Sequence, residues 1–219
     1  MKVSLNQKIL SRNEECAGKN RRFFGKHHIV CLNVISSPGA GKTSLLVRTI
    51  GDLKDKLQIG VIEGDIETDN DARKILAAGA QAFQIETRGA CHLSAEQVHN
   101  ALKMIDAEKM DLIFIENVGN LVCPSAFDLG ETKRVVILSV PEGDDKPAKY
   151  PGTFAGASVV LINKIDLLEH VNFKLQRVLA DIHTVNPKAK IFQLSATTGE
   201  GTDAWYDWLK EQKSICGRQ

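Results

Sequence analysis

A glycine-rich segment between an apolar run and a helical pattern has the residue types that bind phosphate. Residues 36–43 read Ser-Ser-Pro-Gly-Ala-Gly-Lys-Thr, which matches the phosphate-loop pattern G-x-x-x-x-G-K-[ST] except that serine takes the first position. In such a loop, backbone N–H groups converge on phosphate oxygens, the lysine contacts the β- and γ-phosphates, and the threonine hydroxyl binds Mg²⁺. The helix that follows adds the positive end of its dipole. We therefore predict a nucleoside triphosphate site formed by Gly39, Ala40, Gly41, Lys42, Thr43 and Ser44.

Acidic residues at two predicted strand ends have the chemistry to complete a magnesium site beside this loop. Asp65 ends the run IGVIEGD, and Glu116 ends the run LIFIE. Since Mg²⁺ prefers one or two carboxylates and several waters, we predict that both acids bind it with Thr43, directly or through water. A helix cap or a surface acid is the alternative role for each. Phosphoryl transfer depends mainly on positioning and charge stabilisation, so the predicted catalytic set is Lys42, Asp65, Glu116 and Asp69, the last orienting water.

A second motif, Asn163-Lys164-Ile165-Asp166, follows the apolar run VVLI and has the pattern N-K-x-D. The Asp166 carboxylate can accept both the ring N–H and the amino N–H of guanine, whereas adenine would leave it unpaired. Mispairing of this kind costs on the order of 10⁴ in selectivity. Lys164 can lay its methylene stem along the base, and Asn163 ties the loop together. With backbone N–H groups at Ser195, Ala196 and Thr197, the motif predicts GTP and GDP as the nucleotides.

Two cysteines and a histidine lie in segments that leave the same predicted edge of the sheet. Cys91-His92 precedes a helix that begins near Ser94, and Cys123 follows the strand that ends at Glu116. Two thiolates and an imidazole suit Ni²⁺, Zn²⁺ or Cu(I). Cys123 lies just beyond residues 117–121, which must respond to the γ-phosphate, so a metal there would be coupled to the nucleotide. Two small structural cysteines and a capping histidine are the open alternative, and Glu96 is a weaker ligand candidate.

The elements that position these residues alternate between strand and helix. Continuous apolar strands separated by helices indicate an α/β fold with a mostly parallel sheet covered on both faces, whose ligands lie at the carboxyl ends of the strands. An amphipathic N-terminal helix over 4–22 precedes them, and we expect it to pack on the body. The predicted strands are 29–35, 59–65, 80–86, 111–117, 134–140, 158–164 and 189–196, and the predicted helices are 43–57, 70–78, 94–107, 170–185 and 201–213.

Length and composition limit the function classes. A chain of 219 residues with 43% hydrophobic and 25% charged residues is globular, and we divide it into a helical extension (1–28) and a nucleotide-binding domain (29–219). The formal net charge of +1 argues against nucleic acid as a partner. No apolar run approaches the ~20 residues that span a bilayer, and the first residues do not have the pattern of a secretory signal. We expect a cytoplasmic protein without a membrane partner, and the odd number of cysteines, five, fits a reducing compartment.

Six segments together resemble the HypB family, the GTPases that deliver nickel during [NiFe]-hydrogenase maturation. They are the phosphate loop, EGDIETDNDA (63–72), ACHL (90–93), IENVGNLVCP (115–124), EGDDKPAKYP (142–151) and NKID, and the resemblance covers roughly residues 17–210. It implies a P-loop NTPase of the dimerising SIMIBI class. It also implies a nickel site at the interface of a homodimer, with Cys91, His92 and Cys123 as ligands that Zn²⁺ would fit as well. The implied partners are a second nickel-insertion protein and the hydrogenase large-subunit precursor.

Three other functions remain as alternatives. A urease-type nickel GTPase has adjacent Cys, Pro and His in its signature, whereas here Cys91-His92 and Cys123-Pro124 are apart. A P-loop small-molecule kinase would need no cysteines, and the N-K-I-D motif argues against it. A regulatory GTPase whose cysteines are only structural is separated from the first hypothesis by metal titration.

Overall fold

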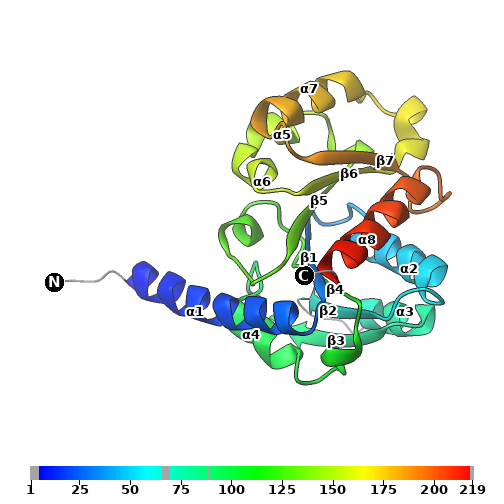
Figure 1. Ribbon diagram of the computed structural model, residues 1–219. Helices are drawn as coiled ribbons and strands as arrows, with labels where there is room; N and C mark the ends of the chain where they lie inside the picture. The colour runs from blue at the N-terminus through cyan, green and yellow to red at the C-terminus, as the bar shows by residue number, and fades with distance from the viewer. Residues whose placement is uncertain (1–4, 66–69, 88, 218–219) are drawn as a thin grey trace.

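Seven parallel strands form one sheet in the order β3-β2-β4-β1-β5-β6-β7 (Figure 1). The computed structural model describes residues 5–65, 70–87 and 89–217, apart from the side chains of residues 5–9 and 65. The strands are β1 (Val30–Ser36), β2 (Ile59–Asp65), β3 (Gln81–Glu86), β4 (Leu112–Glu116), β5 (Lys133–Ser139), β6 (Val159–Asn163) and β7 (Lys190–Leu194). All seven predicted strands are therefore confirmed, with ends that differ by one or two residues.

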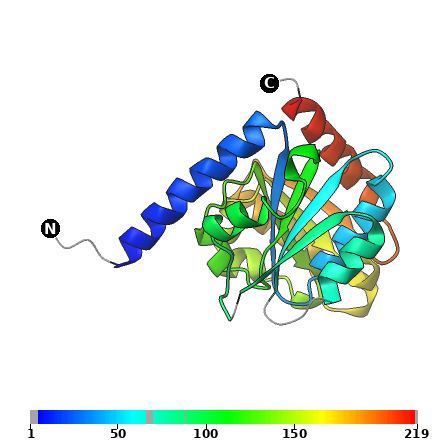
Figure 2. The ribbon, with the colours of Figure 1, turned by 90° about the horizontal axis from the view of Figure 1, so that it is seen from below.

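Helices cover both faces of the sheet, as predicted (Figures 1 and 2). The α-helices are α1 (Leu5–Lys26), α2 (Lys42–Leu53), α3 (Asn70–Ala78), α4 (Ala95–Ala101), α5 (Lys146–Lys149), α6 (Pro151–Ala155), α7 (Leu175–Val185) and α8 (Thr202–Cys216). Four 3₁₀ helices are η1 (Ala107–Lys109), η2 (Cys123–Ala126), η3 (Val140–Glu142) and η4 (Ile165–His170). Among the described residues, no helix is both long and apolar enough to cross a bilayer.

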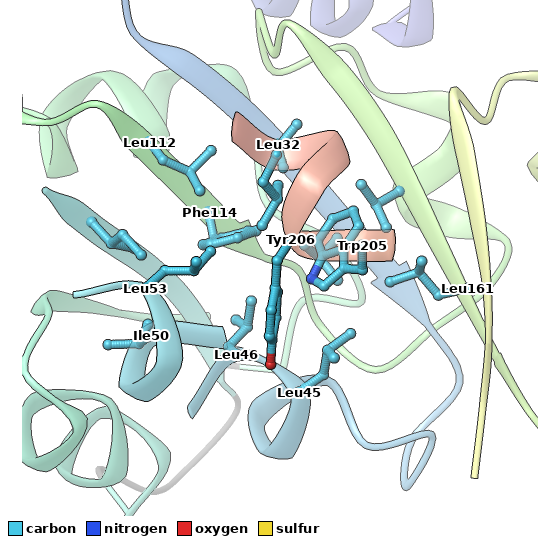
Figure 3. Close-up of a cluster of buried hydrophobic side chains, with 14 of the residues drawn as sticks. Leu32, Leu45, Leu46, Ile50, Leu53, Leu112, Phe114, Leu161, Trp205 and Tyr206 are labelled. Carbon is cyan, nitrogen blue, oxygen red and sulfur yellow. The ribbon is translucent and has the colours of Figure 1, made fainter. Parts of the chain in front are cut away.

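The side chains of each central strand alternate between two apolar layers. Leu112 and Phe114 of β4 pack with α2 and α8, whereas Ile113 and Ile115 pack toward α1 and α4. Figure 3 shows the first layer, in which Trp205 of α8 lies against the leucines of α2. Because both faces of each strand are buried, the strands read as continuous apolar runs rather than alternating ones.

Some helix bounds differ from the sequence prediction. The helix predicted over 94–107 ends at Ala101, because Lys103 N–H donates to Asn100 O (3.2 Å) and Met104 N–H to Ala101 O (2.9 Å). These i→i+3 bonds tighten the chain into turns and end the α-helical ladder. The predicted helix 170–185 begins only at Leu175, after η4, and α1 continues beyond residue 22 to Lys26. The short helices α5 and α6 were not predicted.

The first helix, α1, runs along α4 and extends past the rest of the molecule at its N-terminal end (Figures 1 and 2). Its C-terminal half is anchored in the core by Phe24, which packs among residues of α4, β2 and β4. The expectation that this helix packs on the body is therefore confirmed for its C-terminal half, while Leu10 near its start is exposed.

Candidate functional site

The phosphate loop joins the carboxyl end of β1 to the first turn of α2. Gly39 and Gly41 have positive φ values of 73° and 92°, a conformation that glycine adopts without the steric cost of a Cβ. Lys42 Nζ donates to Ser36 Oγ at 3.0 Å, so the serine that takes the first motif position contacts the motif lysine. The loop forms one wall of a cleft of about 440 Å³ that also includes Thr43, Glu116 and Lys164.

The N-K-x-D motif contacts the phosphate loop directly. Asn163 is buried, and its Nδ2 donates to Ala40 O (2.9 Å) while its Oδ1 accepts from the N–H groups of Lys164 (2.8 Å) and Ala196 (3.1 Å). A Cβ at Gly41 would lie 2.6 Å from Asn163 Nδ2, so glycine is also required there by packing. The predicted tying role of Asn163 thus has a structural basis, and it joins three loops that are far apart in the sequence.

Lys164 and Asp166 are the other two defined residues of the N-K-x-D motif. Lys164 Nζ donates to Gly39 O at 2.7 Å, and Lys164 has a left-handed backbone conformation (φ 63°). The Oδ1 atom of Asp166 is buried and has no hydrogen-bond partner within the described part of the chain. A buried carboxylate oxygen without a partner is costly in a folded protein, and an N–H donor from a ligand would satisfy it. Ser195 is buried at the end of β7, while Thr197 is exposed.

Two carboxylates, one of them the predicted Glu116, lie close to the Thr43 hydroxyl. Thr43 Oγ1 lies 2.8 Å from Glu116 Oε1 and 3.1 Å from Asp71 Oδ2. Glu116 is buried and pairs in register with Glu63 of β2. A hydroxyl with nearby carboxylates is the hard oxygen donor set that suits Mg²⁺. These described residues therefore fit the ion.

Parts of the predicted set are untested, and other residues were missed. The side chain of Asp65 and the whole of Asp69 lie outside the described residues. Asp71 contacts Thr43 and forms an ion pair with Lys74, which raises the pKa of that lysine. Glu63 is buried and lines the cleft. Its position two residues before the end of an apolar strand was the available signal, because alternate residues of a strand face the same side of the sheet.

The cysteine-bearing segments meet outside the cleft. The interaction of the Cys91 thiol with Cys123, with a smaller contribution from burial, raises the pKa of Cys91. Cys91 Sγ lies 3.5 Å from His92 Nδ1, and the His92 ring stacks on Phe127 with 3.8 Å between centroids. Burial lowers the pKa of His92, which favours the neutral imidazole that binds metals.

The three candidate ligands are close together, but they do not form a closed cluster. Within the described residues, no group of three or more His, Cys, Asp or Glu side chains is arranged to hold a metal ion. Glu96, the weaker candidate, forms an ion pair with Arg12 of α1 at 2.7 Å. Cys31 is buried in β1 and lies in the core.

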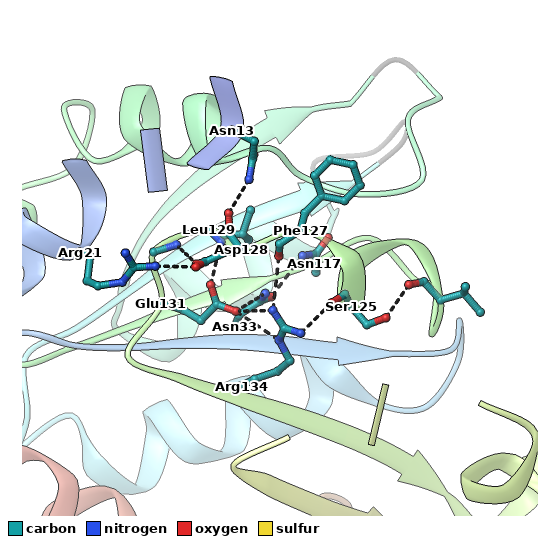
Figure 4. A network of polar contacts seen from close by, with 12 residues as sticks. Asn13, Arg21, Asn33, Asn117, Ser125, Phe127, Asp128, Leu129, Glu131 and Arg134 are labelled. Atoms are coloured by element: carbon teal, nitrogen blue, oxygen red, sulfur yellow. Dashed lines mark hydrogen bonds and ion pairs between the residues drawn. The ribbon is translucent and has the colours of Figure 1, made fainter. Parts of the chain in front are cut away.

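Asn117, the residue after β4, lines the cleft and belongs to a network of polar contacts with Asn33, Glu131 and Arg134 (Figure 4). Its Oδ1 accepts from the backbone N–H of Leu93, which directly follows His92 (3.1 Å), and its Nδ2 donates to Asn33 Oδ1 (3.1 Å). Asn33 Nδ2 in turn donates to Glu131 Oε1 (3.2 Å). Buried hydrogen bonds of this kind are strong because water does not compete for them.

The network continues from Glu131 to the segment of Cys123. Arg134 forms an ion pair with Glu131 at 2.9 Å, and its Nη1 donates to Ser125 O in η2 at 2.8 Å. Because η2 begins at Cys123, a continuous set of buried and partly buried polar contacts links the end of β4 to both candidate ligand segments. Sequence reasoning did not identify this network.

Comparison with known proteins agrees with the geometry. Residues 30–193 match the family of CobW/HypB/UreG nucleotide-binding domains. The hydrogenase maturation factor HypB of Rhizobium leguminosarum bv. viciae is 52% identical over 208 residues, which are 95% of this chain and 70% of that protein.

Two crystal structures have the same fold at 39% sequence identity. HypB from Archaeoglobus fulgidus gives a TM-score of 0.88 over 93% of this chain and all of that one. HypB from Helicobacter pylori, solved in complex with nickel, also gives 0.88, over 93% of this chain and 96% of that one. The identities and the coverage are high enough to indicate more than a shared fold.

Proposed function

The chain belongs to the HypB family of hydrogenase maturation factors, within the CobW/HypB/UreG nucleotide-binding proteins, and from this premise we propose that it is a GTP-hydrolysing nickel metallochaperone. In this proposal a nucleotide-dependent homodimer delivers nickel to the [NiFe]-hydrogenase precursor. A second nickel-insertion protein assists the transfer. The nickel complex of the Helicobacter pylori relative supports nickel as the cargo.

The nucleotide half of the proposal depends on the cleft. The phosphate loop would hold the triphosphate, Lys42 would neutralise charge on the β- and γ-phosphates, and Asp166 would accept the guanine N–H groups. Thr43 and Glu116, with Asp65 directly or through water, would hold Mg²⁺, which supplies positive charge to the transferring phosphoryl group. Asp69 is our candidate for orienting the attacking water. A glutamine following a D-x-x-G motif is not found in the sequence, so we expect slow turnover that depends on the dimer or on a partner.

The metal half depends on Cys91, His92 and Cys123. Their proximity within one chain, without a closed cluster, is consistent with a site that a second subunit completes. The observation that carries the proposal is the position of Asn117. It lines the nucleotide cleft and hydrogen-bonds to the residue that follows His92, so a change at the γ-phosphate has a direct structural route to the metal ligands.

The test is an equilibrium titration of metal-free protein with Ni²⁺, in GDP and in a non-hydrolysable GTP analogue with Mg²⁺, with the molecular mass measured in parallel. We expect about one nickel per dimer interface, an affinity that differs between the two nucleotides, and a mass that doubles from 24.0 kDa with the GTP analogue. Weak nickel binding that is indifferent to nucleotide would contradict the chaperone and favour a GTPase with structural cysteines.

A cysteine variant makes the titration specific. Cys123→Ala removes one thiolate ligand and leaves the cleft unchanged, so stoichiometric nickel binding should be lost while the affinity for the GTP analogue stays the same. Cys31→Ala, in the core of β1, is the control for loss of a thiol as such. Full retention of nickel by Cys123→Ala would remove this residue from the ligand set.

A further inference from the structure

Helix α1 contacts the two cysteine-bearing segments through two buried asparagines, Asn13 and Asn20. Both lie on the face of α1 that packs against α4. They are seven residues apart, about two helical turns, so their side chains point to the same side of the helix. Asparagine is rarely buried without a specific partner. Their contacts therefore define what this face of the helix recognises.

Asn13 bridges the two segments by itself. Its Nδ2 donates to Asp128 O at 2.7 Å, as Figure 4 shows, and its Oδ1 accepts from Ala95 N at 2.9 Å. Ala95 lies three residues after His92, and Asp128 lies five residues after Cys123. One side chain of α1 thus fixes the distance between the two segments that carry the candidate ligands.

Asn20 forms a similar bridge about two turns further along the helix. Its Nδ2 donates to Ala95 O and to Leu129 O, both at 2.9 Å. Because both amide protons are used, its Oδ1 is the acceptor for His99 Nδ1 at 3.0 Å. A Cβ at Gly130 would lie 2.4 Å from Ala17 O, so the second segment approaches the helix backbone closely at this point.

Exposed charges add to the same contacts. Arg12 pairs with Glu96 on α4, and Arg21 pairs with Asp128. These pairs are exposed and contribute little energy. The asparagines are harder to replace, because loss of either side chain leaves two backbone groups without a hydrogen-bond partner. The stack of His92 on Phe127 places a candidate ligand directly against the segment that Asn13 holds.

We propose that α1 positions the metal ligands: Asn13 and Asn20 fix the separation of the segments that carry Cys91-His92 and Cys123. This inference rests on the proposed nickel function. The two asparagines are positioning residues that contact neither metal nor nucleotide. Movement of α1, for example when a partner binds it, would then change the nickel site without passing through the nucleotide cleft.

The test compares full-length wild type with Asn13→Leu, which keeps the number and branching of the side-chain heavy atoms and removes both hydrogen bonds. Metal-free proteins are titrated with Ni²⁺ alone, with binding followed by the thiolate-to-nickel charge-transfer absorption and by competition with a chelator. We expect nickel affinity to fall on the order of tenfold, as for other groups that orient metal ligands. We also expect a changed charge-transfer spectrum, while affinity for the GTP analogue stays within twofold of wild type.

Two further variants keep the test decisive. Asn13→Ala removes the same bonds without adding an apolar branch, and it replaces Asn13→Leu if that protein does not fold. Glu14→Ala, at the exposed neighbouring position, is the matched control and should bind nickel like wild type. Wild-type nickel affinity and spectrum in a folded Asn13 variant would overturn the inference, as would an equal loss of nucleotide affinity. Failure of wild type itself to bind nickel would instead contradict the proposed function.

Discussion

In the proposed function, Asp166 is the residue that selects the nucleotide. Its Oδ1 atom is buried without a hydrogen-bond partner in the described part of the chain, and Asn163, three residues before it, is hydrogen-bonded to the phosphate loop and to Ala196. The loop that carries this carboxylate is therefore held against the phosphate loop. A fixed acceptor selects for a base that presents N–H donors at that position.

The first prediction follows from this acceptor. Asp166→Asn replaces an acceptor oxygen with an N–H₂ donor, so the preference should move from GTP toward xanthosine triphosphate, which presents a carbonyl there. The change in selectivity should be on the order of 10⁴. Competition binding with fluorescent GDP measures it, and Asp203→Asn, on the exposed first turn of α8, is the control. Unchanged GTP affinity in Asp166→Asn would contradict the guanine assignment.

Residues within short motifs were the easiest to predict from the sequence. The phosphate loop and N-K-x-D act through local backbone geometry, so a run of four to eight residues contains most of the information. Glu63 and Asp71 were missed because their proximity to Thr43 and Glu116 arises from strand register and from the start of α3. Such contacts depend on the tertiary fold rather than on spacing along the chain.

At the scale of elements, the end of β4 is the point where the two halves of the function meet. Asn117 lines the cleft, and its side chain contacts Leu93 N and Asn33. From Asn33 the contacts pass through Glu131 and Arg134 to η2. Since every step is a hydrogen bond in a largely buried region, displacement of one member leaves its neighbours unsatisfied.

The second prediction concerns this connection. Asn117→Ala should reduce the difference between the nickel affinities measured in GDP and in the GTP analogue, because the route from the cleft to Leu93 is lost. Stability should fall by about 1–3 kcal/mol, the cost of leaving buried polar groups unpaired. The ratio of the two nickel dissociation constants is the measurement, and Asn100→Ala, at an exposed site on α4, is the control. An unchanged ratio would show that coupling takes another route.

Whole elements were predicted from apolar periodicity, but their side-chain contacts were not. The strand β4 and the start of α4 near Ser94 followed from local pattern. The amphipathic pattern of α1 indicated packing, but Asn13 and Asn20 looked like surface residues because asparagine is usually exposed. Their partners lie 75 to 115 residues away in the sequence. Most of the partner atoms belong to the backbone, so the residue types at those positions do not indicate the contact.

At the scale of the whole molecule, α8 is the C-terminal helix that closes the apolar layer over α2. Trp205 Nε1 donates to Thr49 Oγ1 at 3.2 Å, and Tyr206 donates its hydroxyl to Asp52 Oδ2 at 2.7 Å. Because α2 begins at the phosphate loop with Lys42, these bonds fix the opposite end of the helix that carries the proposed phosphate ligands. The packing of α8 therefore supports the nucleotide cleft at a distance.

The last prediction is an alkaline dependence of stability that arises at Tyr206. Burial and the hydrogen bond to Asp52 raise the pKa of Tyr206 from 10.0 to about 12. A raised pKa means that the folded state holds this proton more tightly than the unfolded chain does. The resulting stabilisation is complete below pH 10 and is lost as the pH rises from 10 toward 12.

Tyr206→Phe removes both the hydrogen bond and the proton that it holds. At pH 8 the variant should be less stable than wild type by about 1–2 kcal/mol, and this difference should shrink above pH 10, as wild type loses the contribution that the variant lacks. Urea unfolding at pH 8, 9.5 and 11 measures it, with Tyr150→Phe, the other tyrosine, as the control for loss of a phenolic hydroxyl. A difference that stays constant or grows with pH would mean that the Tyr206 proton is not held by the fold, and that the contact between α8 and α2 depends on apolar packing alone.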